Sequence, residues 1–159
     1  MLIVHDANIF IDMEAGDLLE AVFRLRHDVI TPDALYDREL KEQHAHLIEL
    51  GLILHEVAPE GVQRSMRLAA THKATSAMDR LCIALAEQED CPLLTGDKRL
   101  RRAARQEGCD VRGTLWLMEE LVRENIVSPE QAHAAYERME TLGRRLPFAK
   151  AHRRLRDLA

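Results

Sequence analysis

The sequence predicts an α/β fold. We expect a three-layer α/β/α domain with a central, mostly parallel sheet of about four to five strands, plus a helical C-terminal extension. Two observations carry this prediction. Short apolar runs alternate with stretches of about 10–15 residues that read as helices, which is typical of a parallel sheet with helical crossovers. Prolines, glycines and acidic residues bound these runs, as expected at strand ends and helix starts. The length, 159 residues, suits one domain.

The first half of the chain is expected to contain three strands separated by helices. The strands are apolar runs, predicted at Leu2–His5, Asp28–Thr31 and Leu52–Val57. The helices are predicted at Asn8–Met13, Gly16–Arg26, Asp33–Leu50 and Pro59–Thr71. Pro32 stops the second strand, and Gly51 closes the long helix.

The second half continues the same alternation. We expect helices at Ser76–Gln88, Lys98–Glu107, Thr114–Glu124 and Pro129–Leu142, and strands at Leu93–Thr95 and Asp110–Arg112. Ser76 stands three residues before Asp79, a spacing typical of a helix start. Residues 1–125 are predicted to form the main domain, and residues 126–159 a helical extension with a basic tail. This extension packs on the same domain or on a partner, and the segment after Pro147 looks able to detach.

Composition excludes several protein classes. Apolar residues make up 47% and charged residues 31%, an ordinary globular profile. Three cysteines (Cys82, Cys91 and Cys109) without a CxxC pair argue against a disulfide framework and a zinc ribbon. No apolar run approaches the ~18 residues of a membrane span, and no basic leader precedes the first strand. We therefore expect a cytoplasmic protein without membrane association.

Charge is distributed unevenly along the chain. The net charge is −5, but residues 144–159 carry +5 and residues 1–143 carry −10. Such a basic tail could bind nucleic acid through its phosphates, or it could pack on the acidic body or on a partner chain.

Four acidic residues stand where an apolar run ends or a helix should begin. They are Asp6, Glu39, Asp79 and Asp97. Ligands of open α/β sheets bind just beyond the carboxyl ends of the strands, so these acids are expected to meet there. Carboxylates cannot all stay ionised side by side without a cation, and Mg²⁺ or Mn²⁺ takes oxygen ligands. A metal held in this way is typical of phosphodiester cleavage.

Each acid also has a purely structural interpretation. Asp6 and Asp97 could cap the helices that follow them, and Asp79 could complement the dipole of its helix. Glu39 lies in a charged helical stretch and could belong to a solvated face.

Five sequence blocks resemble the PIN-domain family of ribonucleases. They are VHDANIFID, TPDALYDREL, TSAMDRLCIALA, LLTGDKRLRRAA and GTLWLMEELV, within residues 1–125. The resemblance is closest to the small prokaryotic members that include VapC-type toxins. It implies that Asp6, Asp79 and Asp97 hold the metal and that Glu39 is the second acid of the centre. Asp37 or Glu42 could replace Glu39, because the second block departs from the common spacing. Thr95 and Asn8 are the implied supporting residues.

The implied activity is metal-dependent endoribonuclease cleavage with Mg²⁺ or Mn²⁺, which leaves a 5′-phosphate. The resemblance further implies a toxin restrained by a cognate antitoxin, and homodimerisation is plausible. Two alternatives remain open: an RNA-processing nuclease that is not a toxin, and a non-catalytic Mg²⁺-binding regulatory domain. The basic residues after Asp97 could line a phosphate track or form a solvated helix face.

Overall fold

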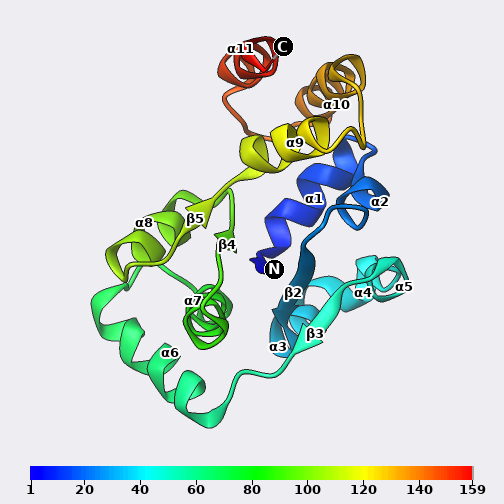
Figure 1. The fold of residues 1–159 in the computed structure, drawn as a ribbon. Coiled ribbons are helices and arrows are strands. Elements are labelled where there is room, and N and C mark those ends of the chain that lie inside the picture. Colours follow the sequence, from blue (N-terminus) through cyan, green and yellow to red (C-terminus); the bar gives the residue numbers. More distant parts are fainter. Residues whose placement is uncertain (159) are drawn as a thin grey trace.

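A five-stranded, all-parallel sheet forms the centre of the molecule (Figure 1). The computed structural model describes residues 1–158. The strands are β1 (Leu2–His5), β2 (Asp28–Pro32), β3 (Ile53–His55), β4 (Leu93–Leu94) and β5 (Val111–Arg112). Their spatial order is β3-β2-β1-β4-β5. The predicted three-layer α/β/α architecture with a parallel sheet is confirmed.

The strand order makes β1 and β4 neighbours, although 87 residues separate the end of one from the start of the other in sequence. Val4 pairs with Leu93, and His5 pairs with Leu94. The backbone amide of Asp6 donates to the carbonyl of Leu94 at 3.0 Å. The chain runs from β1 to β2 and β3 on one side and returns to β4 and β5 on the other. This arrangement creates a topological switch point, the usual position of a ligand site in open sheets.

Helices cover the sheet in two groups. One group comprises α1 (Ala7–Ala15), α2 (Leu19–Val22), α9 (Thr114–Arg123) and α10 (Pro129–Thr141), which contact one another. The other comprises α6 (Pro59–Thr71), α7 (Ala77–Glu89) and α8 (Lys98–Gln106). Of these, α7 lies against β1, β2 and β4. The strands are apolar because both faces are covered, as the full burial of Val4 and Ile30 illustrates.

The predicted long helix Asp33–Leu50 is wrong. The structure has four short pieces there: α3 (Asp33–Leu35), the π-helical turn η1 (Tyr36–Leu40), α4 (Lys41–His44) and α5 (Leu47–Leu50). Leu35 and Leu40 are both fully buried. An α-helix would place them about 140° apart around its axis, whereas a wider turn brings them towards one side. Burial of both side chains is therefore the physical reason for the wider turn.

The predicted helix Gly16–Arg26 is also shorter in the structure, where only Leu19–Val22 is helical. Asp17 has a positive φ of 59°, a left-handed conformation that interrupts a right-handed helix.

A last helix, α11 (Phe148–Asp157), follows Pro147 and packs against α10. Ala151 and Leu155 of α11 are buried. Arg154 donates to the buried carboxylate of Glu119 in α9 at 2.9 Å. The segment after Pro147, which looked able to detach, is thus attached through both apolar and charged contacts. None of the helices within residues 1–158 combines the length and apolar character needed to cross a bilayer.

Candidate active site

Asp6 lies directly after β1 and is the N-cap of α1. Its Oδ1 accepts a hydrogen bond from the backbone amide of Ala7 at 2.8 Å, and its Oδ2 accepts one from the Thr95 hydroxyl at 2.9 Å. The residue is only 4% exposed. A carboxylate is thus held rigidly at the switch point with little access to bulk water.

Thr95 connects the ends of the two central strands. Its buried hydroxyl donates to Asp6 and accepts a hydrogen bond from the backbone amide of Asp97 at 3.1 Å. The side chain predicted as a supporting residue therefore fixes the orientation of Asp6 and the position of the turn that carries Asp97.

Asp97 and Asp79 both stand at the start of a helix. Oδ1 of Asp97, the N-cap of α8, accepts from the backbone amides of Arg99 at 2.8 Å and Leu100 at 3.1 Å. Oδ2 of Asp79 accepts from the backbone amide of Ser76 at 2.9 Å, as part of the predicted capping box of α7. Both acids do cap helices, so the structural interpretation holds alongside the functional one.

The four acids are close enough for their charges to interact. Burial raises the pKa of the Asp6 carboxyl from 3.8 to about 6. The hydrogen bond from Thr95 opposes this rise, and the negative charges of Asp79 and Glu39 add to it. Burial likewise raises the pKa of Asp79, with a further contribution from Asp97. The pKa of Glu39 is raised by burial and then by Asp79. Within residues 1–158, none of the four forms an ion pair with a basic side chain.

This donor set fits a hard divalent cation. All the donors are carboxylate oxygens, and the charge of Arg80, which lowers the pKa of Asp79, offsets only part of the effects that raise it. The carboxylates do not converge fully, however. In the described part of the chain, no three of them bring ligand atoms within 4.8 Å of one another. One oxygen of Asp79 and one of Asp97 are held by amides at the start of their own helices.

Comparison with known protein families gives one match. Residues 2–159 match the model of the DUF3368 family, described as a PIN domain. The chain belongs to the PIN-domain family. PIN domains are generally nucleases, and they typically use divalent metals. The match confirms the resemblance to the PIN-domain family and extends through α10 and α11. No curated protein matches the chain.

In this PIN domain, Glu39 lies in the π-helical turn η1, with its side chain largely exposed. Burial is the main cause of the raised pKa of Asp6 and of Cys82, and the charge of Glu39 adds to both. Asp37 and Glu42, the alternatives to Glu39, are also exposed.

Sequence reasoning missed Asp12, a second buried acid on α1. Its Oδ2 accepts from the Thr114 hydroxyl at 2.9 Å, and its Oδ1 accepts from Nε of Arg144 at 2.6 Å. Asp12 lies at the end of the block NIFID, and an acid within an apolar stretch was the available signal. Asn8, predicted as a supporting residue, lines a cavity of about 240 Å³ together with Asp12 and Arg144. The C-terminal segment thus reaches the neighbourhood of the acidic centre.

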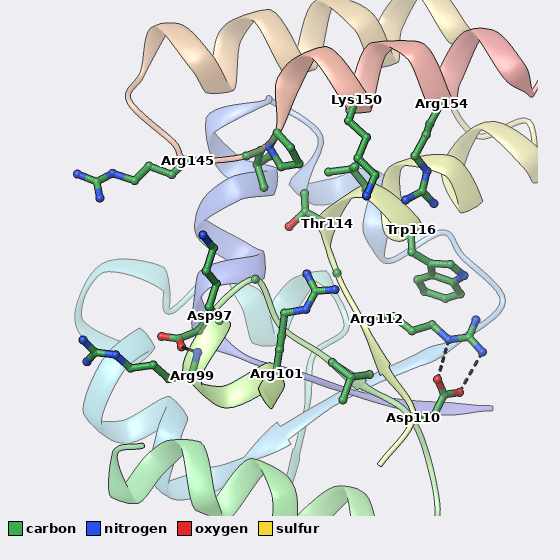
Figure 2. A pocket seen from close by; sticks show the side chains of 17 residues that line it. Asp97, Arg99, Arg101, Asp110, Arg112, Thr114, Trp116, Arg145, Lys150 and Arg154 are labelled. Carbon is green, nitrogen blue, oxygen red and sulfur yellow. Dashed lines mark hydrogen bonds and ion pairs between the residues drawn. The ribbon is translucent and has the colours of Figure 1, made fainter. Parts of the chain in front are cut away.

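A groove that we call the basic groove begins at Asp97 and runs between α8, β5, α9 and α11 (Figure 2). Its volume is about 1320 Å³. Its basic lining residues are Lys98, Arg99, Arg101, Arg112, Arg145, Lys150 and Arg154, and its acidic ones are Asp97 and Asp110. The acidic centre and a strongly basic surface therefore share a border.

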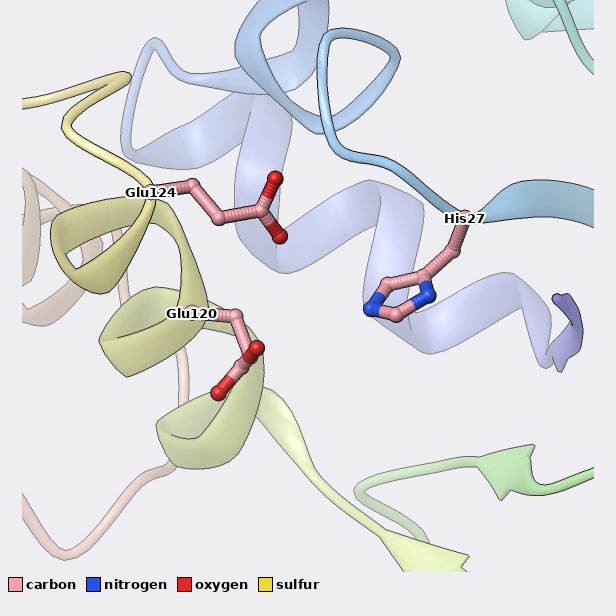
Figure 3. Close-up of side chains that lie close together, drawn as sticks. All are labelled: His27, Glu120 and Glu124. Atoms are coloured by element: carbon pink, nitrogen blue, oxygen red, sulfur yellow. The ribbon is translucent and has the colours of Figure 1, made fainter.

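A separate group with metal-ligand character lies near the start of β2, at the amino-terminal end of the strands. The acidic centre lies at the carboxyl-terminal end. His27, Glu120 and Glu124 bring ligand atoms within 4.8 Å of one another (Figure 3). Both carboxylates already have cationic partners: Arg123 donates to Glu120 at 2.7 Å, and Arg26 lies 3.8 Å from Glu124. We therefore assign no metal to this group.

Proposed function

We propose that this PIN domain is a metal-dependent endoribonuclease. The observation that carries the proposal is Asp6, a buried carboxylate whose pKa is raised to about 6 beside other carboxylates. Retaining an uncompensated acid costs stability, and a divalent cation is the ligand that would relieve that cost.

The residues that would hold Mg²⁺ or Mn²⁺ are Asp6, Asp79 and Asp97, with Glu39 nearby. A bound ion of this kind lowers the pKa of a coordinated water and neutralises charge on the phosphate. Thr95 keeps the Asp6 carboxylate oriented through its hydroxyl. The helix amides occupy only Oδ2 of Asp79 and Oδ1 of Asp97, so the other oxygen of each carboxylate would be available to the ion.

Helix ends add to the favourable environment for a phosphodiester. Asp6 and Asp97 mark the N-termini of α1 and α8, and Asp79 lies in the first turn of α7. Helix N-termini carry partial positive charge and favour anions such as phosphate. A phosphodiester placed here would face this partial charge. The family resemblance points to RNA, cut by water to leave a 5′-phosphate.

The test is cleavage of single-stranded RNA by the purified protein with Mn²⁺, with Mg²⁺ and with a chelator. We expect metal-dependent fragments with 5′-phosphate ends from the wild type. The variant Asp97→Asn should give none, while its thermal unfolding temperature stays the same or rises because carboxylate repulsion is relieved. Single-stranded DNA of the same sequence, cut equally well, would contradict the assignment of RNA.

Two control comparisons sharpen this experiment. Asp33 accepts from the amide of Ala34 at the start of α3, so Asp33→Asn removes a similar helix-end acid outside the centre. It should cleave like the wild type. Glu39→Gln should weaken cleavage more than Asp37→Asn or Glu42→Gln. Loss of cleavage in Asp33→Asn equal to that in Asp97→Asn would argue that helix capping, not metal binding, is what matters.

A further inference from the structure

The basic groove contains positive charge that the rest of the protein does not neutralise. Within residues 1–158, five of its cations make no ion pair: Lys98, Arg99, Arg101, Arg145 and Lys150. The chain has 27 acidic residues and a net charge of −5, so acids to pair with them are abundant in the sequence. Their concentration without acidic partners favours an anionic ligand with several charges.

The cations come from α8 and β5, which are close in sequence, and from the distant C-terminal segment. Lys98, Arg99 and Arg101 belong to α8, Arg112 to β5, and Lys150 and Arg154 to α11. Figure 2 shows Lys150 and Arg154 pointing from α11 towards the side of the groove that carries Arg101 and Trp116. Burial lowers the pKa of Arg101, and the neighbouring charge of Arg105 adds to this effect. The helix α11 thus forms a wall of the groove and contributes to its charge.

An aromatic side chain lies among these cations. Trp116 is half-buried, and the guanidinium carbon of Arg112 stands 4.7 Å from its ring centroid. Arg112 is held in turn by Asp110, which accepts from it at 3.0 Å. A positively charged groove that contains an aromatic ring is the usual combination in proteins that bind single strands, because phosphates contact the cations and bases stack on aromatic rings and on arginine planes. Trp116 and the Arg112 guanidinium over its ring supply both kinds of surface.

We propose that the basic groove binds single-stranded RNA and leads its backbone to the carboxylates, with α11 as part of the binding surface. This inference rests on the proposed nuclease function. Continuity supports it, because Gly96 and Asp97 line the groove and also follow β4 at the acidic centre. An acidic peptide could pair with the cations of the groove. It would have neither a phosphodiester for the acidic centre nor a base to stack at Trp116.

The test is binding of a fluorescein-labelled single-stranded oligoribonucleotide, measured by anisotropy in chelator so that nothing is cut. The double variant Arg99→Gln/Lys150→Gln should bind about tenfold or more weakly. Its salt dependence should be shallower by about 1.4 in the log–log slope, the value for two lost phosphate contacts of a single strand. The matched control is Arg67→Gln/Arg102→Gln, which removes the same charge from α6 and α8 outside the groove. The control should change affinity by less than about twofold.

A second variant probes stacking. Trp116→Leu should weaken RNA binding about fivefold or more, while Trp116→Phe should retain most of it. Binding of inorganic polyphosphate, which has no bases, should be the same in Trp116→Leu as in the wild type. Circular dichroism of each variant checks that the fold is intact.

The outcomes separate this inference from the proposed function. RNA bound through the groove by a protein that never cleaves with metal would support the groove and refute the nuclease. Cleavage and binding at wild-type levels in Arg99→Gln/Lys150→Gln would overturn the groove and leave the nuclease standing. Stronger competition by poly-glutamate than by RNA would also overturn it, because the groove would then belong to an acidic protein partner.

Discussion

Asp6, the N-cap of α1, and Asp12, which lies within α1, are similar buried acids that differ in their charged neighbours. Each is 4% exposed, and each accepts a hydrogen bond of 2.9 Å from a buried threonine, Thr95 or Thr114. Asp12 also has Arg144, whose Nε lies 2.6 Å away, whereas Asp6 has further carboxylates as neighbours. The same side chain is therefore a structural anchor in one place and a group without a counter-charge in the other. Burial alone does not mark a functional acid; burial without a cation does.

The largest expected effect comes from breaking the Asp12 pair. Arg144→Leu leaves a buried carboxylate without its cation, and we expect a loss of about 3–5 kcal/mol in the free energy of unfolding. Urea denaturation in chelator measures it. Arg145→Leu, which removes a charge that forms no ion pair in the described residues, should cost much less. Equal losses in the two variants would show that the Asp12 contact contributes little.

Removing the charge of Asp6 should raise the free energy of unfolding rather than lower it. Because its pKa is raised from 3.8 to about 6, the folded protein keeps a proton that the unfolded chain has already released. Metal-free stability should therefore fall as pH rises from about 4 to about 6, and stay low above that. The shift of about two pH units corresponds to about 3 kcal/mol. Asp6→Asn should remove this fall and be the more stable protein at pH 8.

Calorimetry in chelator across pH 4–8 measures this effect, and Asp12→Asn is the matched control. We expect Asp12→Asn to be less stable than the wild type at pH 8, because Arg144 loses a charged partner. Saturating Mn²⁺ should restore the stability of the wild type at pH 8. The same Mn²⁺ should stabilise Asp6→Asn less. A wild-type stability that does not change between pH 4 and pH 8 in chelator would contradict the raised pKa of Asp6.

The smallest effect concerns the two threonines. Thr95→Val removes the hydroxyl that orients Asp6, so Mn²⁺ affinity should fall about tenfold, as is typical when a hydrogen-bond partner of a metal ligand is lost. Thr114→Val removes the equivalent bond to Asp12 and should leave Mn²⁺ affinity within about twofold. Isothermal titration calorimetry compares them. An equal loss of Mn²⁺ affinity in Thr95→Val and Thr114→Val would contradict the distinction between Asp6 and Asp12.

The sequence was sufficient for most of the fold because the deciding signals are local. Apolar runs defined the strands, and the pair Ser76 and Asp79 marked a helix start that the structure contains. The meeting of Asp6 and the Asp97 turn followed from a general property of parallel sheets, whose strand ends share one edge.

The features that were missed depend on contacts distant in sequence. The turn η1 arises from simultaneous burial of Leu35 and Leu40 against the rest of the core. The partner of Asp12 is 132 residues away, and no local pattern indicates it. The basic groove needs α11 to pack on α10, which places Lys150 opposite α8.

The wide separation of these contacts has a consequence for biosynthesis. Thr95 reaches Asp6 across 89 residues, and Arg144 reaches Asp12 across 132. Domains fold as units while chains are made at about 5–20 residues per second. A growing chain that has only its first strand and helix holds Asp6 without Thr95, Asp79 or Asp97. The nascent chain therefore carries an incomplete centre until Asp97 has been added, and any activity of that centre is delayed until then.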